Sequence, residues 1–89
     1  MDLSFKPGDI VVSTSGHDKN DLFIVVSIDK NGYFVIIDGK KRKRANPKHK
    51  NPKHLLKVAH NEDILNKVNS KTATDTEIFK MIKVYKIKE

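Results

Sequence analysis

The chain has 89 residues and no cysteine, which indicates one small domain without disulfides or thiolate metal sites. A domain of this size leaves little room for a deep catalytic pocket, and the longest apolar run, residues 22–26, is too short to span a bilayer. The formal net charge of +7 is concentrated in residues 40–57, which contain nine Lys or Arg and no Asp or Glu, so this segment should attract polyanions.

Three β-strands are predicted in the first half of the chain. A Pro-Gly turn at residues 7 and 8 precedes a strand over residues 10–14, which are rich in β-branched side chains. After a polar loop, the apolar residues 22–28 predict a second strand and residues 33–37 predict a third.

Two glycine-containing turns punctuate the segment that follows. Asn31-Gly32 indicates a type I′ hairpin turn, which needs φ > 0 at both central positions. Asp38-Gly39 indicates another tight turn, after which Lys40 to Lys53 form one basic stretch. Residues 55–58 are predicted to form a short closing strand.

The second and third strands are apolar at nearly every position, whereas a strand with one exposed face alternates apolar and polar residues. Both faces of this part of the sheet are therefore expected to be covered. One face would line the interior of a small barrel. The C-terminal third would cover the other face.

Two C-terminal helices are predicted to provide this cover. One begins near Asn61 and places Ile64, Leu65 and Val68 on one side. The other begins with a capping box formed by Thr74 and Glu77. Its apolar stripe consists of Ile78, Met81, Ile82 and Tyr85. A separate helical hairpin that docks on a partner is the alternative arrangement.

Residues 6–26 resemble a KOW motif, in which a strand, a loop containing Gly and Lys, and a second strand follow one another. The chain departs from that motif at Asn20, where a KOW loop commonly has a Gly after the Lys. Asn tolerates a left-handed backbone better than most residues, so the turn can survive this difference.

Two later segments, residues 37–44 and 51–55, are similar to large-subunit ribosomal proteins of archaea and eukaryotes and to their short bacterial KOW-domain relatives. In that family an acidic-Gly turn leads into a basic run, and the last barrel strand follows a Lys-His-Leu segment. Asp38-Gly39 and Lys53-His54-Leu55 occupy these places here.

This resemblance implies a mainly β fold with C-terminal α: an SH3-like five-stranded small β-barrel with helices packed on it. The barrel would span residues 1–58, and residues 59–89 would be a helical extension of the same compact unit. The resemblance also implies non-catalytic binding of structured RNA, with ribosomal RNA as the expected target and ribosomal proteins as further partners.

The basic stretch supplies most of the residues expected to contact RNA, because each neutralised phosphate releases condensed counterions. The guanidinium groups of Arg42 and Arg44 can grip two acceptors or stack on a base. Asn46, His49 and His54 can hydrogen-bond to 2′-hydroxyls or base edges. Ser15, Gly16, His17 and Lys19 form a second polar cluster, which lies near the basic stretch if the barrel closes as in the family. The complete predicted set is Ser15, Gly16, His17, Lys19, Lys40, Lys41, Arg42, Lys43, Arg44, Asn46, Lys48, His49, Lys50, Lys53 and His54.

Other kinds of site are not indicated. The four histidines lack nearby Cys or carboxylate ligands at zinc spacing, and no nucleophile triad or phosphate loop is present, so we expect no metal, no cofactor and no enzymatic activity. Phe23, Tyr33 and Phe34 lie inside apolar strands and are expected in the core rather than stacked on bases.

Two other functions remain open at this point. SH3-like barrels also serve as protein-interaction modules, which would use exposed apolar residues of the C-terminal helix, and DNA is a third possible ligand. The N-terminal residues show no basic segment followed by an apolar one, so we expect no signal peptide, no membrane association and a cytoplasmic monomer.

Overall fold

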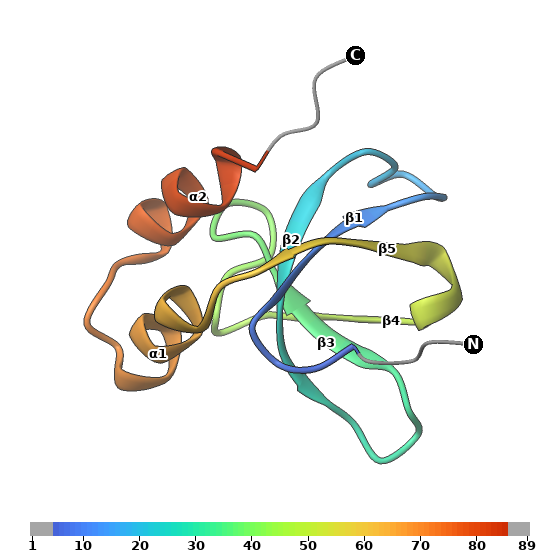
Figure 1. The fold of residues 1–89 in the computed structure, drawn as a ribbon, viewed down its shortest axis with the longest axis horizontal. Coiled ribbons are helices and arrows are strands. Elements are labelled where there is room, and N and C mark those ends of the chain that lie inside the picture. The colour runs from blue at the N-terminus through green and yellow to red at the C-terminus, as the bar shows by residue number, and fades with distance from the viewer. Residues whose placement is uncertain (1–4, 86–89) are drawn as a thin grey trace.

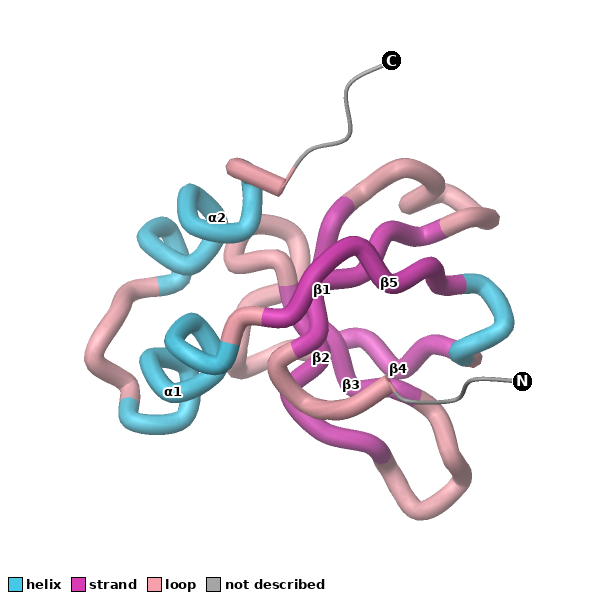
Figure 2. The backbone as a smooth tube through the Cα atoms, in the orientation of Figure 1, coloured by secondary structure: helices cyan, strands magenta, loops and turns pink. Residues whose placement is uncertain are grey.

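The computed structural model describes residues 5–85, which form a curled five-stranded antiparallel sheet and two helices (Figures 1 and 2). The strands are β1 (Asp9–Ser13), β2 (Leu22–Ile28), β3 (Phe34–Ile37), β4 (Lys48–Lys50) and β5 (Leu55–His60). Their order in the sheet is β4-β3-β2-β1-β5, and a 3-10 turn, η1 (Pro52–His54), joins the two end strands. The predicted class, mainly β with C-terminal α, is confirmed.

Two shifts in strand register bend the sheet. One lies between Val25 and Ser27 where β2 pairs with β3, and the other lies between Ile10 and Val11 where β1 pairs with β5. An extra residue in one strand bends that strand and increases its twist. The concave side of the sheet holds a buried cluster of Val11, Phe23, Val25, Phe34, Ile36 and Leu55.

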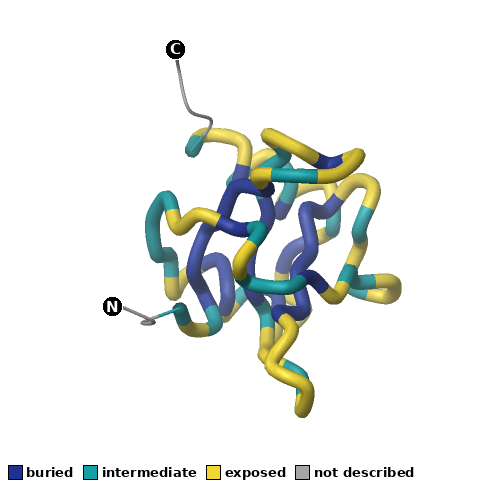
Figure 3. Tube along the Cα trace, turned by 90° about the vertical axis from the view of Figure 1, so that its right-hand side faces the viewer, coloured by how far each residue is buried: buried dark blue, intermediate teal, exposed yellow. Residues whose placement is uncertain are grey.

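The helices α1 (Glu62–Ser70) and α2 (Asp75–Lys83) cover the outer face of the sheet. Ile10, Ile24 and Ile37 point to this side and are no more than 1% exposed. They form a second buried cluster with Ile64, Leu65, Val68, Ala73, Ile78 and Ile82. Neighbouring residues of one strand thus belong to different clusters, which explains why the strands are apolar at nearly every position. Figure 3 shows the resulting unbroken buried stretches of the chain in dark blue. The helices therefore pack on the sheet as predicted.

Both helices begin at the residues that the sequence indicated. The Asn61 side chain accepts a hydrogen bond from the amide of Ile64 at 3.1 Å. Thr74 and Glu77 form the predicted capping box, with bonds of 3.1 and 2.8 Å. Hydrogen bonding of the Glu77 carboxyl to Thr74, above all to its backbone amide, lowers the pKa of that carboxyl. Within residues 5–85, no helix has the length and apolar character needed to cross a membrane.

The β2–β3 hairpin differs from the predicted type I′ turn. Among the described residues, positive φ outside glycine occurs only at Asn20 and Lys71, so Asn31 does not adopt the conformation that type I′ requires. Instead, Gly32 has a φ of +84° and its amide bonds to the Asp29 carbonyl at 3.0 Å. This pattern is a three-residue loop with a type I turn and a glycine bulge.

Several element boundaries also differ from the prediction. β1 begins and ends one residue earlier, β3 begins at Phe34, and β5 continues to His60. Tyr33 is outside β3 and is 42% exposed, so its expected place in the core is wrong, whereas Phe23 and Phe34 are buried. The strand β4 was not predicted, because the sequence Lys-His-Lys has no apolar residue to indicate one.

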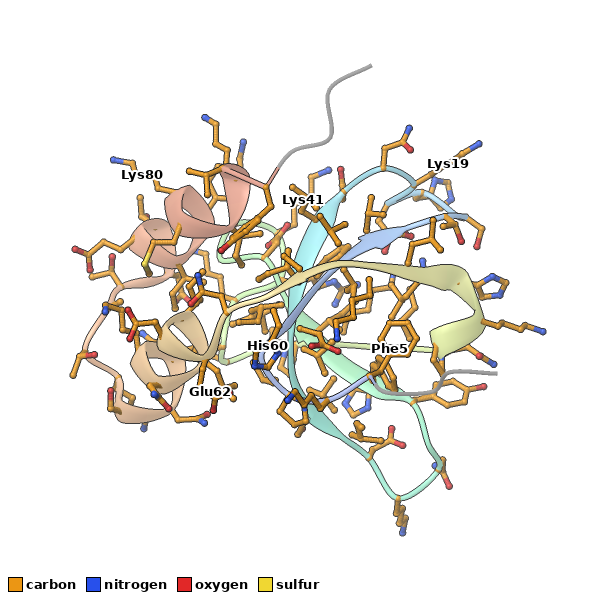
Figure 4. All side chains as sticks on the ribbon, viewed as in Figure 1. Phe5, Lys19, Lys41, His60, Glu62 and Lys80 are labelled. Atoms are coloured by element: carbon orange, nitrogen blue, oxygen red, sulfur yellow. The ribbon has the colours of Figure 1, made fainter. Side chains whose placement is uncertain are left out.

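A fully buried carboxylate, Asp9, joins the N-terminal turn to the end of β5. It accepts hydrogen bonds from the Lys6 amide at 2.8 Å and from His60 Nδ1 at 2.7 Å, and Lys57 Nζ lies 3.4 Å away. His60 Nε2 also contacts Glu62 at 2.9 Å, where β5 passes into α1 (Figure 4). This cluster fixes the point at which the helices leave the sheet.

Gly39 allows α2 to approach the loop after β3. Its φ is +83°, and a Cβ at this position would overlap the Asp75 carbonyl oxygen and lie 2.7 Å from the Phe79 amide nitrogen. Because both obstacles are backbone atoms of α2, they cannot move aside without shifting the helix. Gly39 therefore sets the distance between this loop and α2.

We expect Gly39→Ala to lower the free energy of unfolding by about 3 kcal/mol. A left-handed L-residue costs roughly 1 kcal/mol, and overpacking against α2 adds about 2 kcal/mol. Gly32→Ala is the matched control, because Gly32 has nearly the same φ, +84°, but no atom within 4 Å of its Cβ position. Urea unfolding measures both variants, and equal losses would contradict the proposed close contact.

Candidate nucleic-acid interface

The loop between β1 and β2, residues 14–21, is closed by backbone hydrogen bonds. The Asn20 amide donates to the Ser13 carbonyl at 2.8 Å, and the Ser13 amide donates to the Asp21 carbonyl at 3.0 Å. Asn20 has a φ of +75°, so it adopts the left-handed backbone at the position where a KOW loop commonly has Gly. The turn is thus kept despite this difference in sequence. We call residues 14–21 the first loop.

Asp18 ties the first loop to β4. Its two carboxylate oxygens contact Lys50 Nζ and Lys48 Nζ, each at 2.6 Å, and it also accepts a bond from the Ser13 hydroxyl at 2.7 Å. Lys50 Nζ additionally donates to the Ser15 carbonyl at 2.9 Å. Burial alone would raise the pKa of the Asp18 carboxyl, but the bonds from Lys48, Lys50 and Ser13 outweigh it and hold that pKa well below its usual range. The first loop therefore lies beside the basic stretch, as expected.

Three of the predicted RNA-binding cations are instead used within the fold. The Lys50 side chain is only 8% exposed and the Lys48 side chain is 30% exposed, and both are paired with Asp18. Arg44 holds the first turn of α2, because its amide donates to Asp75 at 3.1 Å and its Nε lies 3.5 Å from the same oxygen. Lys50 in particular cannot reach a phosphate without breaking a buried ion pair.

His49 is also paired, although it is more exposed. Its Nδ1 lies 2.8 Å from an Asp29 carboxylate oxygen on the β2–β3 hairpin. The bond from His49, together with the amides of Tyr33 and Asn31, lowers the pKa of the Asp29 carboxyl. This contact places His49 toward the hairpin rather than toward the first loop.

The cations that remain exposed are concentrated between β3 and β4. The loop there is folded around Asp38, whose Oδ1 accepts bonds from the amides of Lys40 and Arg42, each at 2.8 Å. Lys41 is 74% exposed and lies 4.0 Å from Asp21. Within the described part of the chain, no ion pair involves Lys19, Lys40, Arg42, Lys43 or Lys53.

Two adjoining depressions flank Lys41. The larger, of about 390 Å³, lies between the first loop and the β3–β4 loop and is lined by His17, Phe23, Lys41, Arg42, Asn46 and Lys48, among others. The smaller, of about 280 Å³, lies toward α2 and includes Lys40, Phe79 and Lys83. Asp21, Asp38 and Lys41 line both, so the two depressions are neighbours. Phe79 and Lys83 were not predicted as site residues, because only the packing of α2 brings them beside Lys40.

The remaining predicted residues lie in the first loop and in η1 beside it. Ser15, Gly16 and His17 occupy its tip, and Gly16 has a φ of +88°. Lys53 and His54 belong to η1, which is held to the start of the loop by a bond from the Thr14 amide to the His54 carbonyl at 2.9 Å. Of these five residues, only His17 lines the larger depression.

Neither the known protein families nor the curated proteins compared with this chain give a match. The assignment of the surface therefore depends on its own geometry. That geometry consists of exposed cations around two depressions, held in place by ion pairs beneath them.

We expect Asp18→Asn to lower the free energy of unfolding by about 3 kcal/mol at pH 7, because the change leaves the buried Lys50 ammonium without its carboxylate. Asp63→Asn is the matched control: Asp63 pairs with Lys67 on the exposed side of α1, and such pairs contribute about 0.5 kcal/mol. Urea unfolding distinguishes the two variants, and a similarly small effect at both positions would contradict the structural role of Asp18.

The stabilising effect of Asp18 should depend on pH. Because folding lowers the pKa of this carboxyl from 3.8, its contribution is essentially complete above about pH 5 and is lost as the pH falls through 3.8 toward the folded pKa. The difference in unfolding free energy between the native protein and Asp18→Asn should therefore be constant from pH 5 to 7 and shrink below pH 4. Urea unfolding across this pH range measures it, and a difference that grows on acidification would contradict the assignment.

Proposed function

We propose that the protein binds structured RNA, without catalysis, through the surface formed by the first loop and the β3–β4 loop. The observation that carries this proposal is the group of cations from Lys40 to Lys43, of which the three lysines are exposed and Arg42 is half-buried, beside two adjoining depressions. Acidic residues near them, such as Asp18 and Asp38, are bonded to the protein itself. Phosphates offer the matching charge, and neutralising each one releases condensed counterions.

The chemistry of the larger depression supports RNA as the polyanion. The β3–β4 loop contributes Lys41, Arg42 and Asn46 to its lining, and the first loop contributes His17. Imidazole and amide groups can both donate hydrogen bonds to and accept them from 2′-hydroxyls and base edges, whereas a lysine ammonium can only donate. A groove that combines cations with such groups suits a backbone that carries both phosphates and 2′-hydroxyls.

We further propose that the protein is a KOW-type, SH3-like-barrel protein that acts in the cytoplasm as a ribosomal or ribosome-associated monomer. Support comes from the strand order and from the left-handed Asn20 in the first loop. Ribosomal RNA is the proposed target, with ribosomal proteins as further partners.

A protein-interaction module is the competing function. It would use exposed apolar residues of the C-terminal helix, but Ile78 and Ile82 are buried against the sheet. The most exposed large apolar residues within residues 5–85, Val84 and Leu56, lie on different elements, after α2 and on β5. The cationic depression therefore has more support as the binding surface.

The test is a fluorescence-anisotropy titration with ribosomal RNA fragments and matched DNA across a salt series. With about five phosphate contacts, the slope of log affinity against log salt should be about −3.5, since each contact contributes roughly −0.7. Lys41→Glu combined with Lys43→Glu should weaken binding at least about tenfold and reduce the slope by roughly 1.4.

The matched control is Lys30→Glu with Lys71→Glu, which makes the same change in net charge at exposed positions on the β2–β3 hairpin and after α1. This control should retain most of the affinity. Equal losses in both double variants would reduce the interaction to a general charge effect. Equal binding of RNA and DNA, with a shallow slope, would favour a protein partner instead.

A further inference from the structure

The smaller depression combines an apolar floor with a cationic rim. Leu22, Phe79 and Ile82 form the apolar part, and Lys40, Lys41 and Lys83 lie around it. Asp21 and Asp38 also line it, and Asp38 is bonded to the amides of Lys40 and Arg42. In Figure 4, Lys41 lies between α2 and the first loop, which carries Lys19. The volume of the smaller depression, about 280 Å³, suits one small planar ring system rather than a folded segment of another protein.

Phe79 is the central feature of this depression. Its side chain is only partly buried, and the Lys40 and Lys83 ammonium groups lie 5.4 and 5.8 Å from its ring centroid. A nucleotide carries the two complementary parts in one unit: an aromatic plane that stacks on a ring, and flanking phosphates that pair with ammonium groups.

We propose that this depression binds one unpaired nucleotide of RNA, with its base stacked on Phe79 and its flanking phosphates on Lys40 and Lys83. This inference rests on the proposed RNA-binding function and adds a specific site to it. Lys40 and Lys83 are exposed and have long, flexible side chains. A base can therefore replace their ammonium groups over the Phe79 ring, while the ammonium groups move to the flanking phosphates. Base stacking on an aromatic ring is stronger than an exposed lysine–phenylalanine contact.

The nucleotide must be unpaired because paired bases are stacked inside an RNA helix and cannot reach a side depression. The larger depression adjoins the smaller one, and Lys41 lines both. A helix that places its backbone in the larger depression can therefore insert a bulged base into the smaller one. The preferred ligand is an RNA stem with a bulge.

The experiment compares two RNA hairpins that differ only in one bulged nucleotide, which is 2-aminopurine as a fluorescent probe. The native protein should bind the bulged hairpin about tenfold more tightly and change the probe's fluorescence on stacking. Phe79→Leu should remove this preference and the fluorescence change, while its affinity for the fully paired hairpin stays within about twofold. Phe79→Tyr should retain both.

Tyr33→Leu is the matched control, because it removes an exposed aromatic residue from the β2–β3 hairpin, away from the depression. Thermal melting checks each variant. If the Phe79→Leu variant does not fold, the same comparison is made with Lys83→Met, a change on the exposed side of α2. This variant should have a smaller preference for the bulged hairpin.

The outcomes separate this inference from the proposed function. Equal binding of both hairpins by the native protein, or equal loss of both in Phe79→Leu, would overturn the unpaired-base site and leave RNA binding standing. Failure to bind either hairpin or any ribosomal RNA fragment would overturn the proposed function itself.

Discussion

Three isoleucines, Ile10, Ile24 and Ile37, give the outer face of the sheet an apolar surface that the rest of the molecule must cover. Burying each of them is worth about 2 kcal/mol, a large amount for a domain of this size. The helices α1 and α2 provide this cover. Their position then determines the second constraint, the contact between α2 and Gly39, which fixes the loop that carries the exposed cations.

The basic stretch has two physical roles that its composition does not distinguish. Lys48 and Lys50 are paired with Asp18 and form part of the scaffold, and Arg44 is bonded to Asp75 in the same way. The lysines between β3 and β4 remain exposed. The acidic residues of the first half that the structure describes are thus mostly internal partners, which leaves the charge of the exposed lysines largely uncompensated. A local positive potential arises from this division of roles.

The parts of the fold that were predictable depend on local patterns. The capping box at Thr74 and Glu77 and the start of α1 at Asn61 are set by neighbouring residues, so the sequence reveals them. The Asn-Gly pair at residues 31 and 32 was ambiguous, because a glycine with positive φ serves both a type I′ turn and a type I turn with a bulge.

The parts that were not predictable depend on partners distant in sequence. Lys50 is buried only because Asp18, on another loop, neutralises it. β4 has no apolar side chain and is a strand because β3 supplies its hydrogen bonds. In the sequence, Phe79 is one more residue of an amphipathic helix and does not indicate a site. Only the approach of α2 to Gly39 brings it to the candidate site.

β4 also affects how the sheet behaves toward other chains. It is an end strand of only three residues, Lys48–Lys50, and prolines at positions 47 and 52 lie on either side of it. Proline has no amide hydrogen to offer a further strand. On this side the sheet therefore ends in a short edge that gives an incoming strand few hydrogen bonds, and a very short edge strand is one way to disfavour pairing between sheets of different molecules.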